Sequence, residues 1–251
     1  MMTFPTRRST SLIALAVALV PGLATAQDRN IQFELGLGTS LAPTYEGSDD
    51  YKAGVALTGS LQALSLGPLQ IQPGQLGFGL APSFRYLSER TKDDVPMLRG
   101  IDDVDAALEL GLKASYRWDY AEAWGALRKG VTGHEGMVAD LGADAIIDAG
   151  SNTTLRFGPR VSFADDSYMD TYFTVPTTAT RLRAYDADGG LKSFGLEMSL
   201  RHDVTEAWAV QGTLGWTQMA GDAADSPIVK AGDRDQGTVS LMLIRKFDWR
   251  F

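Results

Sequence analysis

Residues 239–251, VSLMLIRKFDWRF, end the chain and indicate how it folds. Apolar side chains at positions 239, 241, 243, 247, 249 and 251 alternate with polar ones at 240, 246, 248 and 250, and Arg245 interrupts the apolar series. A period of two places successive side chains on opposite faces of a β-strand. We therefore predict a closing strand with one apolar face, one polar face and an aromatic last residue.

The same alternation recurs along the chain. Between Ile31 and Leu41, for example, Ile, Phe and Leu side chains alternate with Gln, Glu, Gly and Ser. The alternating segments run about 11 to 15 residues, longer than the usual 5 to 6 of soluble strands and close to the length of a tilted membrane strand. We predict strands over residues 30–41, 53–64, 76–87, 104–118, 121–131, 136–148, 152–164, 190–202, 206–219 and 237–251.

These strands predict an all-β fold, a closed antiparallel transmembrane β-barrel of ten strands. Short connections alternate with long ones, as they do in barrels of the Gram-negative outer membrane whose termini lie in the periplasm. The last strand would then pair with the first near Ile31 to Leu41 and leave no exposed edge. Twelve strands are the alternative, because Tyr168 to Tyr185 could hold an extra hairpin, and the inner connection at 65–75 is unusually long.

The first 26 residues read as a secretory signal peptide. Arg7 and Arg8 precede an apolar run from Leu12 to Val20, and small residues lead to a predicted cleavage between Ala26 and Gln27. We expect residues 27–251 to form the barrel. Removing two arginines and no acidic residue changes the formal net charge from −8 to −10, which disfavours nucleic acid as a partner. The chain has no cysteine, so disulfides and a lipidated N-terminus are excluded.

The end of the chain resembles the terminal strand that outer-membrane barrels present to their assembly machinery. Phe247, Trp249 and Phe251 are the residues that we expect to carry this signal. The expected partners are therefore the barrel-assembly machinery together with outer-membrane lipid and lipopolysaccharide.

Few residues suggest chemistry, and we predict no enzyme, no cofactor and no metal. His134 lies in a short predicted loop, while His202 ends a strand with Ser199 on its opposite face, which does not suit a nucleophile and its base. The acidic clusters lack the spacing of a calcium loop and fit solvated loops better. Ten strands enclose little free space, so a wide pore is disfavoured. Several residues could pair across the lumen: Arg117, Arg156, Arg160 and Arg201 with Glu109, Asp140 and Glu197.

Three stretches together resemble the MipA/OmpV family of outer-membrane proteins. They are LAPTYEGSDDY at 41–51, YMDTYFTV at 168–175 with AYD at 184–186, and GDAADSPIV at 221–229. The family pattern would end near Phe247, so Asp248 to Phe251 look like an extension. The motif residues that we single out as candidate loop sites are Pro43, Tyr45, Glu46, Gly47, Ser48, Asp49, Tyr172, Tyr185, Asp186, Asp225, Ser226 and Pro227.

The resemblance implies a scaffold that links a lytic transglycosylase to a bifunctional murein synthase. It brings no catalytic residues with it. From the residues themselves, each motif also suits a structural role, since Pro43 and Gly47 shape a loop and Ser226-Pro227 starts a turn. The alternatives are a narrow outer-membrane channel, an adhesion or stress-response barrel, and a lipid-modifying hydrolase that uses His202.

Deleting residues 248–251 tests which aromatic residue ends the assembly signal. We expect the truncated chain to assemble poorly in the outer membrane, because the chain then no longer ends on Phe251. The measurement is the amount of folded protein in outer-membrane fractions. Unimpaired assembly would show that Phe247 is sufficient.

Overall fold

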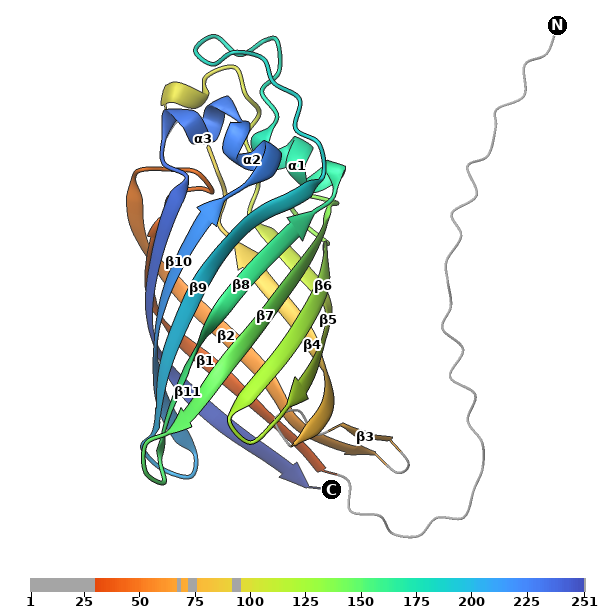
Figure 1. Cartoon of the computed structure of the whole chain (residues 1–251), viewed down its shortest axis with the longest axis vertical. Coiled ribbons are helices and arrows are strands. Elements are labelled where there is room, and N and C mark those ends of the chain that lie inside the picture. The colour runs from red at the N-terminus through yellow and green to blue at the C-terminus, as the bar shows by residue number, and fades with distance from the viewer. Residues whose placement is uncertain (1–29, 67–68, 72–75, 92–95, 251) are drawn as a thin grey trace, which may run out of the picture.

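The computed structural model describes residues 30–66, 69–71, 76–91 and 96–250. In this part of the chain, ten long antiparallel strands form a tilted barrel, so the predicted ten-strand fold is confirmed (Figure 1). The strands are β1 (Asn30–Pro43), β2 (Tyr51–Leu66), β4 (Gly77–Leu87), β5 (Ala107–Arg117), β6 (Ala121–Gly130), β7 (Met137–Asp148), β8 (Thr153–Ala164), β9 (Gly190–Asp203), β10 (Trp208–Met219) and β11 (Asp235–Arg250). The short strand β3 (Leu69–Ile71) pairs with the end of β2.

The two ends of the barrel differ. The terminal end carries the start of β1, the end of β11 and the short connections at 118–120, 149–152 and 204–207 (Figure 1). The opposite, capped end carries a 3-10 turn η1 (Pro96–Leu98) and three helices, α1 (Asp166–Phe173), α2 (Gly221–Asp225) and α3 (Pro227–Ala231). We call residues 44–50, 96–106, 165–189 and 220–234 the cap.

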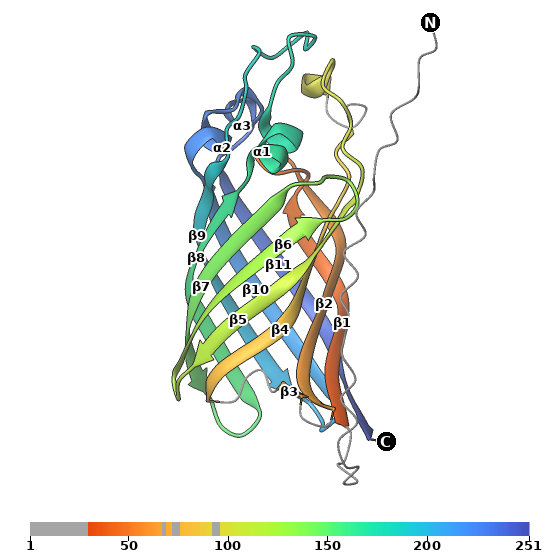
Figure 2. The same ribbon diagram turned by 90° about the vertical axis from the view of Figure 1, so that its right-hand side faces the viewer.

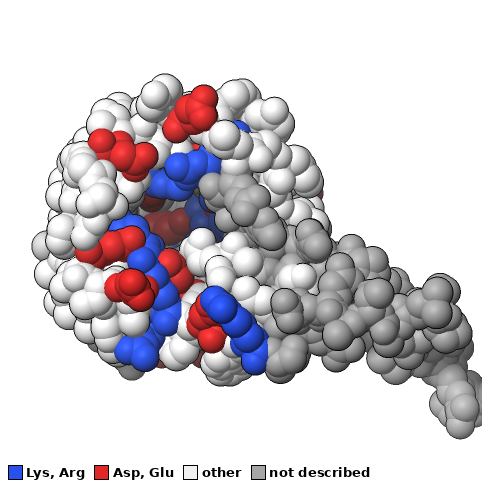
Figure 3. Space-filling view, turned by 90° about the horizontal axis from the view of Figure 1, so that it is seen from below, with Lys and Arg blue, Asp and Glu red and all other residues white. Residues whose placement is uncertain are grey.

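The strand faces have the reverse polarity of a water-soluble protein. On β5, Leu112 is 58% exposed on the outer face, whereas Glu109 is fully buried on the inner face. Seen from the terminal end, acidic and basic side chains gather inside the ring of strands (Figure 3). An apolar outside and a charged inside suit a barrel that is surrounded by lipid, because lipid-facing and lumen-facing residues alternate along each strand.

The first and last strands pair along almost their whole length, as predicted. The register runs from Ile31 opposite Trp249 to Leu41 opposite Val239. The rings of Phe33 and Phe247 stack with their centroids 4.8 Å apart at the terminal end. Phe251 and the predicted cleavage site at Ala26 and Gln27 lie outside the described residues.

One seam interrupts the hydrogen-bonded wall. The sheet order runs from β3 and β2 through β1 and β11 around to β4, so β2 and β4 are its two sides in the described chain. Figure 2 shows these two strands next to each other. A Cβ atom on Gly59 of β2 would lie only 2.7 Å from Cζ of Phe84 on β4. At this level the seam is therefore closed by a side chain packed on a glycine.

The twelve-strand alternative is wrong, because residues 168–173 are helical. Asp165 caps α1 by accepting a hydrogen bond from the backbone N–H of Tyr168 at 2.9 Å, as an N-cap residue does. The rest of the expected hairpin is reduced to one isolated bridge between Val175 and Tyr185.

Two further segments differ from the prediction. The strand expected from residue 104 begins at Ala107, and Val104 forms an isolated bridge with Arg90. The segment expected to be a loop before the last strand contains α2 and α3. No helix in the described ranges is long and apolar enough to cross a membrane.

Leu37, at the middle of β1, tests the lipid-facing assignment. It pairs with Leu57 on one side and Leu243 on the other, and all three are exposed on the outer face. We expect Leu37→Arg to lower the free energy of unfolding in lipid vesicles by about 2–4 kcal/mol, the cost of an arginine near the bilayer midplane. Urea titration of the vesicle-embedded protein measures it.

Leu37→Met is the matched control, because it keeps an apolar side chain at the same place. An arginine variant as stable as this control would show that the outer face of β1 is not in contact with hydrocarbon.

Candidate functional site

The cap has an apolar core of its own. Its larger cluster centres on α1 and includes Tyr168, Met169 and Phe173 together with Val229 of α3. A smaller cluster joins Leu98, Ile101, Val175 and Ile228. Connections that are far apart in the sequence thus pack on one another through shared apolar clusters, and the cap folds as one unit.

The loop at 44–50 is fastened to the last connection of the barrel. Gly47 has φ +95°, a backbone conformation that favours glycine, and a Cβ atom there would lie 2.6 Å from a methyl group of Val229. Both the backbone conformation and the lack of space therefore require glycine at this position. The backbone N–H of Gly47 donates to the side chain of Gln236 at 3.1 Å, and Gln236 donates to the carbonyl of Ser48 at 3.1 Å. The backbone N–H of Asp233 donates to the carbonyl of Gly47 at 3.0 Å.

Ser226 joins the three helices. Its hydroxyl donates to the carbonyl of Phe173 at the end of α1 (2.6 Å) and accepts from the backbone N–H of Ile228, which caps α3. Pro227 occupies the first turn of α3, where its missing N–H has no cost. The hydroxyl of Tyr185 donates to the carbonyl of Asp222 at 3.1 Å, which attaches the long connection to α2.

The structure therefore places all three motif stretches in or next to the cap. Pro43 ends β1, and Tyr45 packs beside the smaller apolar cluster. Asp49, Asp186 and Asp225 are exposed on the cap surface. The remaining candidates point inward or hold the connections together.

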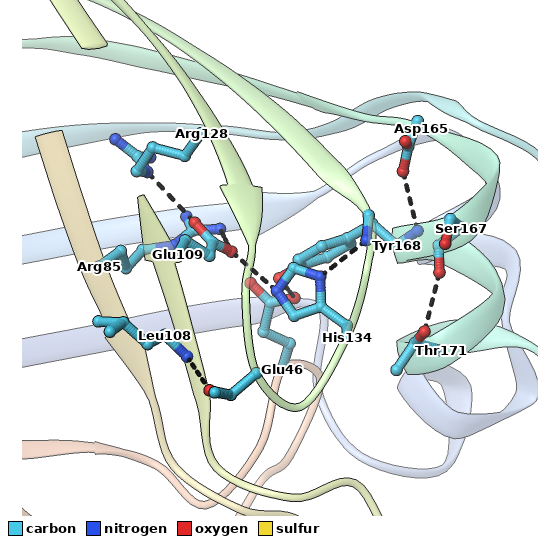
Figure 4. A network of polar contacts seen from close by, with 12 residues as sticks. Glu46, Arg85, Leu108, Glu109, Arg128, His134, Asp165, Ser167, Tyr168 and Thr171 are labelled. Atoms are coloured by element: carbon cyan, nitrogen blue, oxygen red, sulfur yellow. Dashed lines mark hydrogen bonds and ion pairs between the residues drawn. The ribbon is translucent and has the colours of Figure 1, made fainter. Parts of the chain in front are cut away.

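A network of buried and half-buried charges lies beneath the cap (Figure 4). In its first part, the carboxylate of Glu46 accepts a hydrogen bond from the hydroxyl of Tyr168 at 2.9 Å. The other oxygen of Glu46 lies 2.5 Å from Nζ of Lys192. The ammonium group also stands over the ring of Tyr168, 4.9 Å from its centroid. A motif glutamate from the first connection thus meets a motif tyrosine from α1.

The second part is centred on Glu109. Its carboxylate accepts from Arg85 at 2.7 Å and from Arg128 at 3.2 Å, and Arg128 also contacts Asp140. His134 Nε2 lies 3.3 Å from Glu109, while Nδ1 accepts from the backbone N–H of Gly136 at 3.1 Å. The ring of His134 meets the rings of Tyr168 and Tyr172 edge to face, which joins the two parts.

The charges of this network balance. Three carboxylates, on Glu46, Glu109 and Asp140, face three bases, on Arg85, Arg128 and Lys192. Removing one member of a buried pair costs about 3–5 kcal/mol, since the remaining charge stays buried without its partner. The network therefore ties the cap to the barrel wall. Within the described ranges, no three His, Asp or Glu side chains are grouped so that they could hold a metal ion.

Lys192 was missed at the sequence level for a structural reason. The alternation from Phe194 onward would place position 192 on the lipid face. The β8–β9 register shifts, however, with Ser162 opposite Ser193 and Phe163 opposite Leu191. The extra residue in this bulge is Lys192, which is buried.

The pKa values of Glu46 in the cap and of His134 beneath it are both lowered. Burial alone would raise the pKa of the Glu46 carboxyl, but the positive charges of Lys192 and Arg85 and the bond from Tyr168 hold it below its usual value. Burial lowers the pKa of His134, and the attraction of Glu109 only partly opposes this effect. A proton on Nδ1 would also face the N–H of Gly136, so the folded cap favours the neutral imidazole.

A second polar region, which we call the vestibule, is a cavity of about 630 Å³ at the terminal end. Arg201 forms a two-bonded pair with Glu34 there, at 2.7 and 2.8 Å, and Arg160 pairs with Glu197 at 3.0 Å as predicted. Glu109 pairs with Arg85 and Arg128 instead of the arginines named from the sequence. The vestibule is lined by six basic residues, Lys113, Arg117, Arg156, Arg160, Arg201 and Lys246, and four acidic ones, Glu34, Asp144, Glu197 and Asp203.

His202 lies at the terminal end of β9. Its Nδ1 is 2.8 Å from the hydroxyl of Thr153 on β8, its neighbour across the ladder. Ser199 lines the vestibule, on the other face of the strand. The structure therefore does not bring the serine and the histidine of this pair together.

The lipid-facing surface, the charged lumen and the nearly continuous ladder together define an outer-membrane β-barrel protein. A family model described as "MltA-interacting protein MipA" matches residues 35–247. The chain belongs to this family.

Among solved structures, the chain is similar to the COG4313 outer membrane channel from Pseudomonas putida F1, with 13% identity, a TM-score of 0.43, and coverage of 92% of this chain and 100% of that one. It is also similar to outer membrane protein H (OprH) from P. aeruginosa, with 12% identity, a TM-score of 0.36, and coverage of 85% and 99%. The comparison with curated proteins found no match.

The lowered pKa of His134 predicts that acid loosens the cap. An opened cap would release His134 to its ordinary pKa of about 6.5 and bind a proton more readily than the closed cap. Closure should therefore weaken as the pH falls below about 6.5, by up to about tenfold per pH unit. The stabilisation of the closed cap by the Glu46 carboxylate is lost only as the pH falls below 4.5, the usual pKa of a glutamate. Hydrogen exchange of the α1 amides between pH 7.5 and 5, corrected for intrinsic rates, measures this effect.

His134→Gln should remove the acid sensitivity, because glutamine can still accept from Gly136 but does not titrate. His202→Gln is the matched control, because it removes the other of the two histidines in the sequence at the opposite end. An unchanged acid response in His134→Gln would assign the sensitivity to another group.

Proposed function

We propose that the chain is a non-enzymatic scaffold of the outer membrane that binds a lytic transglycosylase and, through it, a bifunctional murein synthase. The description of its family as MltA-interacting supports this proposal. The structural observation that carries it is the vestibule, a hollowed and charged surface at the terminal end. Murein lies on the periplasmic side of the outer membrane, where barrels of this type have their termini and short turns.

The charge of the vestibule suits an acidic segment of a partner protein. Lys113 and Arg156 lie 3.4 and 3.2 Å from the same carboxylate, that of Glu122, and Arg117 lies 3.9 Å from it. The single carboxylate of Glu122 can neutralise only one of these three positive charges, so this side of the vestibule keeps an excess of positive charge. The whole chain carries −8, so the excess is local. Complementary charge raises the rate and the specificity of association.

The placement of the two histidines supports a role without catalysis. His202 faces Thr153 and not Ser199, and His134 is enclosed by aromatic rings beneath the cap. Among the described residues, neither histidine has a serine hydroxyl within hydrogen-bonding distance, which a serine hydrolase would need.

A narrow channel is the second candidate, favoured by the size and polarity of the vestibule. Small barrels are filled by their own side chains, and the charged network under the cap occupies the other end. We therefore expect no discrete openings of the purified protein in a planar bilayer. Repeated openings would favour the channel.

Charge reversal in the vestibule tests the scaffold. We expect Arg117→Glu with Arg156→Glu to lower co-purification of the lytic transglycosylase from cross-linked envelopes about tenfold or more, the loss typical of charged contacts in an interface. The matched control is Lys230→Glu, an exposed reversal at the capped end. Folding of each variant is checked by its heat-modifiable mobility in gels. Folded vestibule variants that bind as well as the control would contradict the proposal.

A further inference from the structure

A second cavity, of about 490 Å³, lies at the capped end of the seam. Its inner wall includes Ser40 of β1, Thr217 of β10 and Thr238 of β11. Its opposite side is lined by Val55 of β2 and Tyr86 of β4, on either side of the seam. We call this the seam cavity. Its size falls within the range of small-molecule sites.

Two residues of the lipid-facing series line the seam cavity. Val55 is 66% exposed and Tyr86 is 55% exposed, and both belong to the outward series of their strands. Further toward the terminal end, Phe84 on Gly59 closes the seam. The position between Val55 and Tyr86, which we call the window, lies where no ladder joins β2 to β4 in the described chain, and both residues line the cavity. An apolar chain could pass through this window from the membrane.

The inner part of the cavity has polar groups without partners. Tyr172 is only 6% exposed, yet its hydroxyl makes no hydrogen bond within the described structure. Arg90 binds the carbonyls of Tyr172 and Thr171 through its two terminal nitrogens, while its buried Nε has no partner. Buried polar groups are normally bonded, so two orphans lining one cavity point to a ligand with acceptor atoms.

The charges around the cavity favour an anion. Lys52 lines it from the inner face of β2, and no ion pair of Lys52 occurs among the described residues. Arg90 adds a second positive charge. The lining also contains Glu46, but this carboxylate is already bonded to Lys192 and Tyr168. The lining therefore carries the two positive charges of Lys52 and Arg90 against one carboxylate, which Lys192 already pairs.

We propose that the seam cavity binds one anionic amphiphile, a carboxylate or phosphate head group with an alkyl chain. The head group accepts hydrogen bonds from Tyr172 and lies between Lys52 and Arg90, and the chain leaves through the window between Val55 and Tyr86. The ligand class follows from the combination of an opening toward lipid and a buried cationic end. This site is separate from the vestibule, so it does not depend on the scaffold proposal.

Binding of three probes with the same chain tests the head group. Dodecanoate, dodecyl phosphate and uncharged dodecanol are titrated against the full-length mature protein in an uncharged detergent, by competition with a dansylated undecanoate. We expect the two anions to bind about tenfold or more tightly than dodecanol, because a hydrogen bond to a charged group is worth that much. Equal affinity for all three probes would overturn the proposal.

Variants locate the site. Lys52→Met and Tyr172→Phe should each weaken dodecanoate binding about tenfold and leave dodecanol unaffected, whereas Lys230→Met, outside the cavity, should change neither. Val55→Trp narrows the window and should slow association, with Val239→Trp as the matched control on the lipid face of β11. Variants that fold, by heat-modifiable mobility, and bind like their controls would overturn the proposal.

The source of the ligand is tested separately. Protein from vesicles of phosphatidylethanolamine and phosphatidylglycerol, with dodecanoate added, is examined by native mass spectrometry. One bound phosphatidylglycerol indicates a membrane lipid, and one bound dodecanoate indicates a free fatty acid, and either result supports the site. Protein that carries neither, or that carries them equally in Lys52→Met, would contradict it.

Discussion

Hydrocarbon offers no hydrogen bonds, so every backbone N–H and carbonyl of a membrane-spanning strand needs a partner within the protein. The ladders from β2 through β1 and β11 to β4 meet this requirement almost everywhere. The same closure forces every second side chain into a narrow lumen. Most charges there are paired: Glu109 lies between Arg85 and Arg128, and Arg201 binds Glu34 with two hydrogen bonds.

The barrel could be predicted because its wall separates two contrasting environments. Strand geometry places successive side chains on opposite faces. Because one face meets lipid and the other meets a charged lumen, the sequence alternates between apolar and polar residues, as Leu112 and Glu109 illustrate. Closure of the barrel then makes the first and last long strands neighbours, and their even number makes this pairing antiparallel. The helix α1 escaped prediction because residues 168–175 are rich in Tyr, Phe, Thr and Val, which favour strands, whereas the capping carboxylate of Asp165 favours a helix. The seam escaped as well, because a face pattern does not say which edges form hydrogen bonds.

The candidate site was predicted only in part. The motif residues were placed in loops, and the structure does gather those loops at one end. That Glu46 meets Lys192 could not be foreseen, because the contact spans 146 positions and depends on a bulge that reverses the orientation of Lys192. His134 stood alone in a short loop, and its neighbours Glu109, Tyr168 and Tyr172 come from other strands and from α1. Such contacts follow from the topology and not from local pattern.

The fastening of Gly47 to Asp233 and Gln236 has a consequence for how the barrel reaches its correct alignment. A ladder that slips by two residues keeps apolar side chains outside and polar ones inside, so lipid alone discriminates poorly between the two alignments. The cap contacts have no such repeat. A slip of two residues between β1 and β11 would move Gly47 about 7 Å from its partners. The contacts of the cap therefore form only when β1 and β11 have the correct register. In a barrel whose strands have slipped, the cap would not close.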